Sequence, residues 1–475
     1  MARTGGGGER MSGRLTLSLV SHTNVGKTTL ARTLLGKDVG EVRDRAHVTE
    51  ESTRHVLVTD ADGGELVLWD TPGFGDSARL LARLRASEEP LKAFFAQTWD
   101  RLADRPLWCG QQAARNVRDE ADCVLYLVNG AENPEDAGYV HAELELLAWI
   151  GRPVLLLLNQ TGPPREAGER RAEEDAWRTR CEGFDIVRGV LGLDAFTRCW
   201  VQEGALLEAV REALPLERRS ACDPLLEAWM DERRVRWRTA MSLIAKELWR
   251  AGDDREELEE GALRAGRRRG MERLAARLEN GLGRALDELI ELHGIEGRGR
   301  AELRTALKDF AATGGGLSPR KLGLRGAVIS GFIGGLAADL ASGGFSLGGG
   351  MLLGAAGGWL AGHGAGRAVE WVSGKEHPCV EWTPGLLERL AQELLLRYLA
   401  VAHFGRGQGN WRDGQGPGFW SEHVARALAE RSEEFTGALE TGRADGGGPA
   451  ALEAVLTDAT RAALVACYPR AARLL

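Results

Sequence analysis

The stretch LSLVSHTNVGKTTL, residues 17–30, predicts a strand, a tight loop and the start of a helix. In a Walker A loop the backbone N–H groups wrap the phosphates, the lysine neutralises β- and γ-phosphate charge, and the hydroxyl after it holds Mg²⁺. The alternative is a chance Gly-Lys-Thr at an ordinary helix start. The strand–loop–helix context favours a phosphate loop. Its predicted binding residues are Ser21, Asn24, Val25, Gly26, Lys27, Thr28 and Thr29.

The first position of this loop is Ser21, where the usual pattern has glycine. A side chain is tolerated there if φ is negative, but a Gly-only conformation would be strained by a Cβ atom.

Short apolar runs alternate with helical patterns from Leu15 to about Leu214. This alternation predicts an α/β fold with a mostly parallel sheet covered on both faces. The runs HVLVTD and ELVLWD are joined only by ADGG, which predicts one antiparallel edge pair. We therefore expect a P-loop α/β domain at 14–215, preceded by a disordered tail at 1–13.

A second phosphate motif, DTPGFGDS, begins where the strand ELVLWD ends. Asp70 can support Mg²⁺, and the Gly73 N–H can meet the γ-phosphate. In the polar segment before the hairpin, Thr53 is placed to ligate Mg²⁺ and contact the γ-phosphate. The alternatives are an ordinary strand-ending turn and a surface loop. The predicted catalytic residues are Lys27, Thr53 and Gly73, and the predicted Mg²⁺ residues are Thr28, Thr53 and Asp70.

The segments TNVGKTTL, STRHV and DTPG resemble, in this order, the G domain of Era- and TrmE-type bacterial GTPases. The resemblance covers about residues 14–205 and implies binding of GTP and Mg²⁺. The whole chain is similar to a bacterial group in which such a domain precedes a helical, glycine-rich domain of unknown function.

Phe74 stands where small GTPases of the Ras kind have the glutamine that orients water, so we expect slow intrinsic hydrolysis. In TrmE-like GTPases a loop asparagine helps to bind K⁺, and Asn24 matches it by position. The resemblance thus implies K⁺-stimulated hydrolysis, with homodimerisation through the G domain. The alternative is that Asn24 only caps the loop.

The segment PVLLLLNQTGPP, residues 153–164, keeps Asn159 of the Asn-Lys-x-Asp motif. Gly162 replaces the aspartate that accepts hydrogen bonds from guanine, and Asp194 is a candidate substitute. Loss of a charged acceptor costs about 1.5–3 kcal/mol, roughly a 10- to 100-fold loss of selectivity. GTP with relaxed selectivity, ATP, and weak binding without turnover all remain open, and the resemblance favours GTP.

Helical patterns rich in Arg, Glu, Leu and Ala follow the α/β domain. We expect a helical region at 216–313, a glycine-rich hairpin at 314–372 and a C-terminal helical region at 373–475. The predicted helices cover 224–250, 255–292, 300–312, 384–403, 418–441 and 449–474, and those of the hairpin cover 322–341 and 346–371.

Small residues recur every fourth position in the hairpin, as at Gly350, Gly354 and Gly358. This spacing lets two helix backbones approach closely. It fits membrane contact through 322–371 or a tightly packed helical core. Arg325 and Asp339 would be costly at a bilayer centre.

The formal net charge of −8 argues against a nucleic-acid partner. We expect a cytoplasmic protein, either free or at the inner face of the membrane. The function predicted from these motifs is Mg²⁺-dependent GTP hydrolysis coupled to the helical part. The alternatives are an ATPase, or a membrane-associated scaffold or remodelling protein with a structural nucleotide site.

Overall fold

The computed structural model divides the chain into two compact units, and the residues up to Arg233 belong to the first. The structure describes residues 13–36, 52–86, 88, 104–161, 165, 167–193, 199–259, 264–295, 369–372, 379–403, 418–444 and 448–475.

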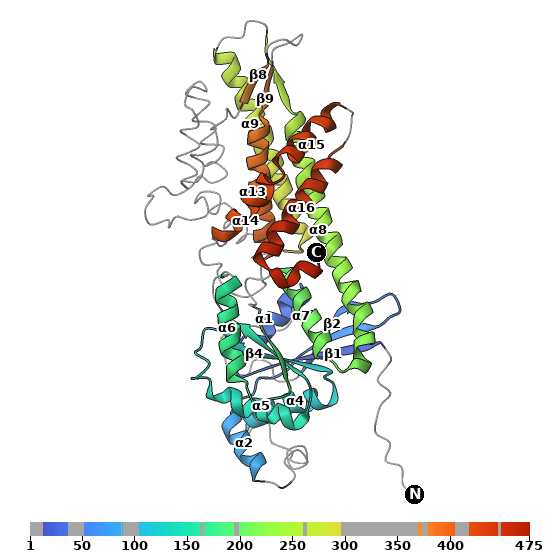
Figure 1. The fold of residues 1–475 in the computed structure, drawn as a ribbon, viewed down its shortest axis with the longest axis vertical. Coiled ribbons are helices and arrows are strands. Elements are labelled where there is room, and N and C mark those ends of the chain that lie inside the picture. Colours follow the sequence, from blue (N-terminus) through green and yellow to red (C-terminus); the bar gives the residue numbers. More distant parts are fainter. Residues whose placement is uncertain are drawn as a thin grey trace. The chain divides into compact units, whose positions relative to one another are not determined.

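A six-stranded sheet in the order β2-β3-β1-β4-β5-β6 forms the centre of the first unit (Figure 1). Its strands are β1 (Arg14–Ser21), β2 (Thr53–Thr59), β3 (Glu65–Asp70), β4 (Cys123–Asn129), β5 (Val154–Asn159) and β6 (Val187–Gly192). All neighbours pair in parallel except β2 and β3, which form an antiparallel pair at one edge. The predicted fold class is therefore confirmed. The sixth strand, β6, was not among the predicted strands.

Helices cover both faces of this sheet, with α4 and α5 on one face and α1 and α7 on the other (Figure 1). The described helices of this unit are α1 (Lys27–Leu35), α2 (Ser77–Arg85), α4 (Arg105–Asp119), α5 (Gly138–Ile150), α6 (Ala167–Arg180) and α7 (Trp200–Ala213). Strands buried on both faces read as continuous apolar runs, as β4 and β5 do.

The strand register brings the predicted motifs to one edge of the sheet. Leu19, near the end of β1, pairs in parallel with Asp70, the last residue of β3. Asn159 ends β5 beside Asn129, which ends β4. In open α/β sheets ligands bind outside the carboxyl ends of the strands. The loops that follow β1, β3, β4 and β5 all start from that edge.

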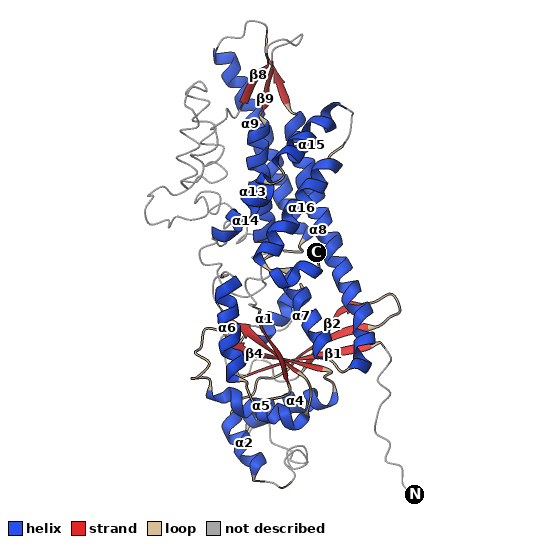
Figure 2. Cartoon of the chain, viewed as in Figure 1, coloured by secondary structure: helices blue, strands red, loops and turns tan. Residues whose placement is uncertain are grey.

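The second unit is mainly helical (Figure 2). Its elements are α9 (Arg264–Leu292), α13 (Pro384–Ala402), α14 (Gly418–Ala429), α15 (Ser432–Ala444), α16 (Ala450–Cys467) and the 3-10 helix η2 (Pro469–Arg473), and α8 (Leu216–Asp253) contains the boundary between the units. The described part of this unit also contains a three-stranded antiparallel sheet in the order β7-β9-β8. Its strands are β7 (Arg255–Glu257), β9 (Cys379–Trp382) and β8 (Val369–Val372).

Three of the predicted helices are wrong in part. Residues Arg255–Glu257 form β7, and Val369–Val372 form β8, because both pair with β9 (Cys379–Trp382). The predicted helix over 418–441 is divided into α14 and α15. The pairing of β7 with β9 joins segments far apart in the sequence, so no local pattern could show it. β8 and β9 are neighbours in the sequence, but each has only four residues, which leaves little alternation to recognise.

The glycine-rich hairpin up to residue 368 and the predicted helix at 300–312 lie outside the described residues. Among the described helices, none has the length and apolar character that crossing a membrane requires.

Candidate functional site

The loop after β1 has backbone geometry that only some residues can adopt. Gly26, the N-cap of α1, has φ 92° and ψ 28°, and Asn24 has φ 65°. A Cβ atom on Gly26 would lie 2.7 Å from Asn159 Nδ2. Glycine is therefore required at this position both by its left-handed conformation and by the close approach of Asn159.

Ser21 fits the first position of the loop without strain. Within the described part of the chain, the non-glycine residues with positive φ are Asn24 and Gln160, and Ser21 is not one of them. The Ser21 hydroxyl also forms a hydrogen bond within the loop, since Lys27 Nζ donates to Ser21 Oγ at 2.9 Å.

Lys27 is 8% exposed and lies inside the phosphate loop. Burial lowers the pKa of its ammonium group, and the charges of Asp70 and then Glu143 oppose that change. Bound phosphates would strengthen the opposing effect because they add negative charge beside Nζ. The loop therefore presents a lysine suited to meeting phosphate charge.

Thr28 and Asp70 form the most specific polar contact of the site. Thr28 Oγ1 donates to Asp70 Oδ2 at 2.7 Å. The other carboxylate oxygen, Oδ1, is buried and has no hydrogen-bond partner. Burial raises the pKa of Asp70, while Lys27 and the Thr28 hydroxyl oppose the increase. A hydroxyl and a carboxylate with a spare oxygen are hard oxygen donors, so these residues fit Mg²⁺.

Thr53 is the first residue of β2 and pairs directly with Asp70 across the antiparallel edge. It is exposed, and residues 37–51 before it lie outside the described part of the chain. The structure thus brings Thr53 to the same end of the sheet as Thr28 and Asp70.

Gly73 lies against the phosphate loop. A Cβ atom there would be 3.1 Å from Lys27 Nζ and 3.3 Å from Thr23 Cα. The next residue is bonded to the loop twice, since Phe74 N donates to Ser21 O at 2.9 Å and Thr23 Oγ1 donates to Phe74 O at 3.0 Å. The Phe74 ring is fully buried in a hydrophobic core cluster that also contains Leu80 and Leu107.

Asn159 connects the loop after β5 to the phosphate loop. Its side chain is fully buried, and Nδ2 donates to Val25 O at 2.6 Å. The next residue, Gln160, turns the chain with φ 58°. Residues 162–164 and the candidate acceptor Asp194 lie outside the described residues. The predicted residues Val25 and Thr29 are both buried where the loop joins α1.

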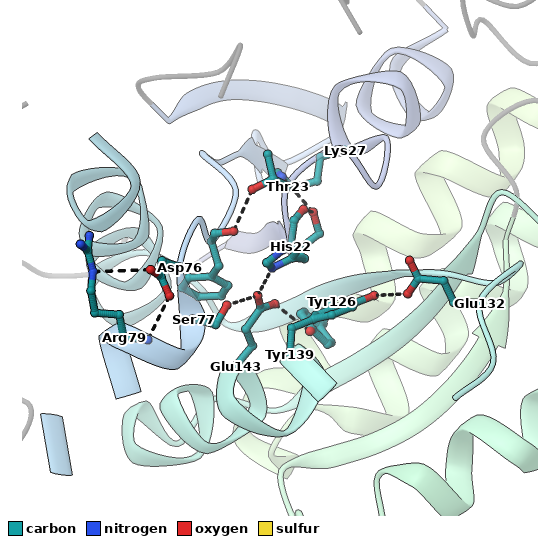
Figure 3. Close-up of polar contacts among 12 residues, drawn as sticks. His22, Thr23, Lys27, Asp76, Ser77, Arg79, Tyr126, Glu132, Tyr139 and Glu143 are labelled. Atoms are coloured by element: carbon teal, nitrogen blue, oxygen red, sulfur yellow. Dashed lines mark hydrogen bonds and ion pairs between the residues drawn. The ribbon is translucent and has the colours of Figure 1, made fainter. Parts of the chain in front are cut away.

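Sequence reasoning missed Glu143, a carboxylate of α5 that is 1% exposed. Its Oε1 contacts His22 Nδ1 at 2.7 Å and the Ser77 hydroxyl, and its Oε2 accepts from Tyr126 Oη at 2.7 Å (Figure 3). A signal was present in the sequence: positions 140, 143, 144 and 147 follow helical spacing, and the other three are apolar. A glutamate within an apolar stripe needs partners in the core.

These features define the first unit as a P-loop nucleotide-binding domain. Residues 16–160 match the family model described as "50S ribosome-binding GTPase". Residues 186–445, more than half of the chain, match the one described as "Domain of unknown function (DUF3482)". The chain belongs to the DUF3482 family. The DUF3482 match begins just before β6, so it includes the last strand of the nucleotide-binding sheet.

Two curated relatives resemble the GTPase domain at low identity. GTPase Era of Heliobacterium modesticaldum is 26% identical over 159 residues, which cover 33% of this chain and 44% of that protein. GTPase Era of a Geobacter species is 27% identical over 145 residues, covering 30% and 39%. The chain thus spans less than half the length of these relatives.

The solved structure of Era in complex with MgGDPNP and nucleotides of 16S ribosomal RNA is 17% identical to this chain. The alignment covers 42% of this chain and 57% of that one, with a TM-score of 0.32.

Proposed function

We propose that this protein is a Mg²⁺-dependent GTPase whose nucleotide state changes the conformation of its helical unit. The observation that carries the proposal is the contact of Thr28 with Asp70, which leaves Asp70 Oδ1 buried without a partner beside Lys27. Such an orphaned oxygen is costly to bury unless a ligand uses it. Mg²⁺ would supply neutralisation of phosphate charge there.

The chain's own residues have separable roles in this proposal. Lys27 and the N–H groups of the loop hold the phosphates, and Thr28 with Asp70 holds the metal, with Thr53 completing its ligands. Gly73 lies close enough to Lys27 Nζ for its N–H to meet the γ-phosphate. Phe74 offers no polar group to orient water, so we expect a slow intrinsic rate.

Guanine is the base we propose, because the family model and the Era relatives belong to GTPases. The bond of Asn159 to Val25 supports a role for Asn159 in holding the base loop next to the phosphate loop. Competition of labelled GTP with excess GTP or ATP tests the base: equal displacement by ATP would reject guanine selectivity.

The metal site is tested with two threonines of the same helix. Thr28→Ala removes the hydroxyl at Asp70, whereas Thr33→Ala removes one that bonds to Thr29 O within α1. We expect Thr28→Ala to reduce hydrolysis at least about 10-fold, since one charge-assisted bond is worth about 1.5–3 kcal/mol, with the loss partly offset by raised Mg²⁺. The Thr33→Ala protein should retain the wild-type rate. If both variants behave alike, Thr28 does not serve the metal.

K⁺ stimulation is a further part of the proposal and depends on Asn24. Asn24 has a left-handed backbone conformation, with φ 65°, within the phosphate loop. The TrmE resemblance is the support for a K⁺ ion near this side chain.

A further inference from the structure

The carboxylate of Glu143 joins three parts of the GTPase domain inside the protein (Figure 3). It comes from α5, and its side chain is fully buried. His22 belongs to the phosphate loop, Ser77 is the first residue of α2, and Tyr126 lies in β4. One buried group therefore contacts the loop, the helix after Gly73 and the core of the sheet.

The two carboxylate oxygens of Glu143 have different hydrogen-bond partners. Oε1 is shared by His22 Nδ1, at 2.7 Å, and by the Ser77 hydroxyl. Oε2 accepts from Tyr126 Oη at 2.7 Å, and burial keeps the pKa of that phenol well above its ordinary value, so Tyr126 acts as a donor. His22 Nδ1 and the Ser77 hydroxyl both lie within hydrogen-bond distance of Oε1. The loop and α2 thus meet on a single oxygen atom.

His22 is held in place from a second direction. Its ring stacks on Tyr139, with 4.5 Å between ring centroids and 29° between the planes. Tyr139 belongs to α5, as Glu143 does, and its hydroxyl donates to Glu132 Oε2 at 2.9 Å. The imidazole is therefore oriented by both its hydrogen bond and its ring contact.

The chain between Gly73 and Ser77 is attached at both of its ends. Phe74 is bonded to Ser21 and Thr23 in the phosphate loop, and Ser77 is bonded to Glu143. If Gly73 moved towards a γ-phosphate, this segment would pull on the start of α2. The bond between Ser77 and Glu143 would oppose that movement. Glu143 therefore connects the segment after Gly73 to α5 through its bond to Ser77.

We propose that Glu143 is a positioning residue for GTP hydrolysis, which holds the phosphate loop and the start of α2 in register through the oxygen shared by His22 and Ser77. The inference rests on the proposed GTPase function. Glu143 acts through His22 and Ser77 and touches no substrate itself.

The alternative is that Glu143 only ties α2 to α5 for stability. A second contact between these helices provides the matched comparison. Arg85 of α2 pairs with Glu145 of α5, and the Arg85 side chain is 56% exposed. Glu145→Gln makes the same chemical change as Glu143→Gln, on the same helix, and loosens the same pair of helices without affecting the phosphate loop.

The experiment measures GTP hydrolysis by Ser77→Ala, Glu143→Gln and Glu145→Gln in the full-length protein. Ser77→Ala deletes only the hydroxyl, and alanine favours the helix. Because the bond from Ser77 to Glu143 is lost, kcat should fall about 10-fold in Ser77→Ala, which corresponds to about 1.4 kcal/mol. KM for GTP should stay within about two-fold, because the Ser77 hydroxyl is bonded to Glu143 and is not one of the proposed nucleotide-binding groups. Glu145→Gln should match the wild type.

A second readout does not depend on turnover. Amide exchange of residues 78–85 should differ between the proteins bound to GDP and to a non-hydrolysable GTP analogue. This difference should persist in Glu145→Gln and vanish in Ser77→Ala and Glu143→Gln. A purely structural role would shift exchange equally with both nucleotides, and that result would overturn the inference.

A double-mutant cycle of His22→Ala and Ser77→Ala tests the shared oxygen. Because both side chains act through Glu143, the combined loss of kcat should be smaller than the product of the single losses. Fully multiplicative losses would show that they act independently. Absence of GTP binding by the wild type would reject the proposed function itself. An active wild type with Ser77→Ala equal to Glu145→Gln would reject only the role of Glu143.

Discussion

Asn159 Nδ2 donates a 2.6 Å hydrogen bond to the carbonyl oxygen of Val25, joining the end of β5 to the phosphate loop. Both partners are buried. The bond fixes the distance between the loop expected to contact the base and the loop expected to hold the phosphates. Loss of this bond should therefore disturb both the loop expected to contact the base and the loop expected to hold the phosphates.

Asn159→Ala should therefore weaken binding of GDP and GTP together. It leaves the Val25 carbonyl without its partner, at a cost of about 1–3 kcal/mol, or roughly 5- to 100-fold in Kd. Asn129→Ala is the matched control, since Asn129 pairs with Asn159 in the sheet but its side chain caps the local turn at Ala131. Fluorescent-nucleotide titration measures both. Equal affinities for the two variants would contradict a role for the bond to Val25.

Replacement of Na⁺ by K⁺ at equal ionic strength should increase the rate of GTP hydrolysis. The expected reason is that a K⁺ ion near Asn24 adds positive charge where Phe74 offers none. Asn24→Ala should abolish the difference between the salts while retaining most of the rate in NaCl. Equal wild-type rates in KCl and NaCl would show that Asn24 only shapes the loop.

Local geometry explains why the sequence predicts the positions of several candidate site residues. The Gly-Lys-Thr run follows a strand, and Asp70 and Asn159 each end one. The carboxyl ends of parallel strands meet at one edge of the sheet. Glu143 was missed because its partners are far away along the chain. Ser77 and His22 are separated from it by 66 and 121 residues.

The second unit was less predictable for a related reason. Helical periodicity located α8, α9, α13 and α16 approximately, because each buries a stripe of apolar residues. The strands β7 and β8 are three and four residues long and depend on pairing with β9. Short strands carry too little alternation to be recognised without their partners.

Phe74→Gln should destabilise the protein without accelerating hydrolysis. The glutamine would restore the residue that orients water in Ras-like proteins, but the Phe74 ring is fully buried in a core cluster. Loss of a buried ring costs about 3–5 kcal/mol when it is truncated, and a buried amide adds desolvation. Thermal unfolding and GTP turnover measure the two effects. Phe74→Leu, which keeps an apolar side chain, should lose less stability. Faster hydrolysis by Phe74→Gln would contradict the interpretation that Phe74 serves the core and that its position cannot orient water.

His55 should titrate below its ordinary pKa in the nucleotide-free protein. Partial burial on β2 lowers the pKa, and the charge of Asp70 opposes the decrease. Asp70→Asn should therefore lower the pKa of His55 further, whereas Asp60→Asn, which changes an exposed turn of the same hairpin, should not. NMR titration of the imidazole signals, assigned with His55→Gln, measures the shift.

The same His55 shift sets the sign of a small pH effect on stability. A base whose pKa is lower in the folded state binds fewer protons there than in the unfolded chain. Its contribution to stability is thus present above the unfolded pKa, near 6.5, and is lost as the pH falls through the lowered value. The effect is modest because His55 is partly exposed to solvent. Urea unfolding from pH 7.5 to pH 5 should lose stability slightly faster in the wild type than in His55→Gln, and parallel losses would show that His55 is not shifted.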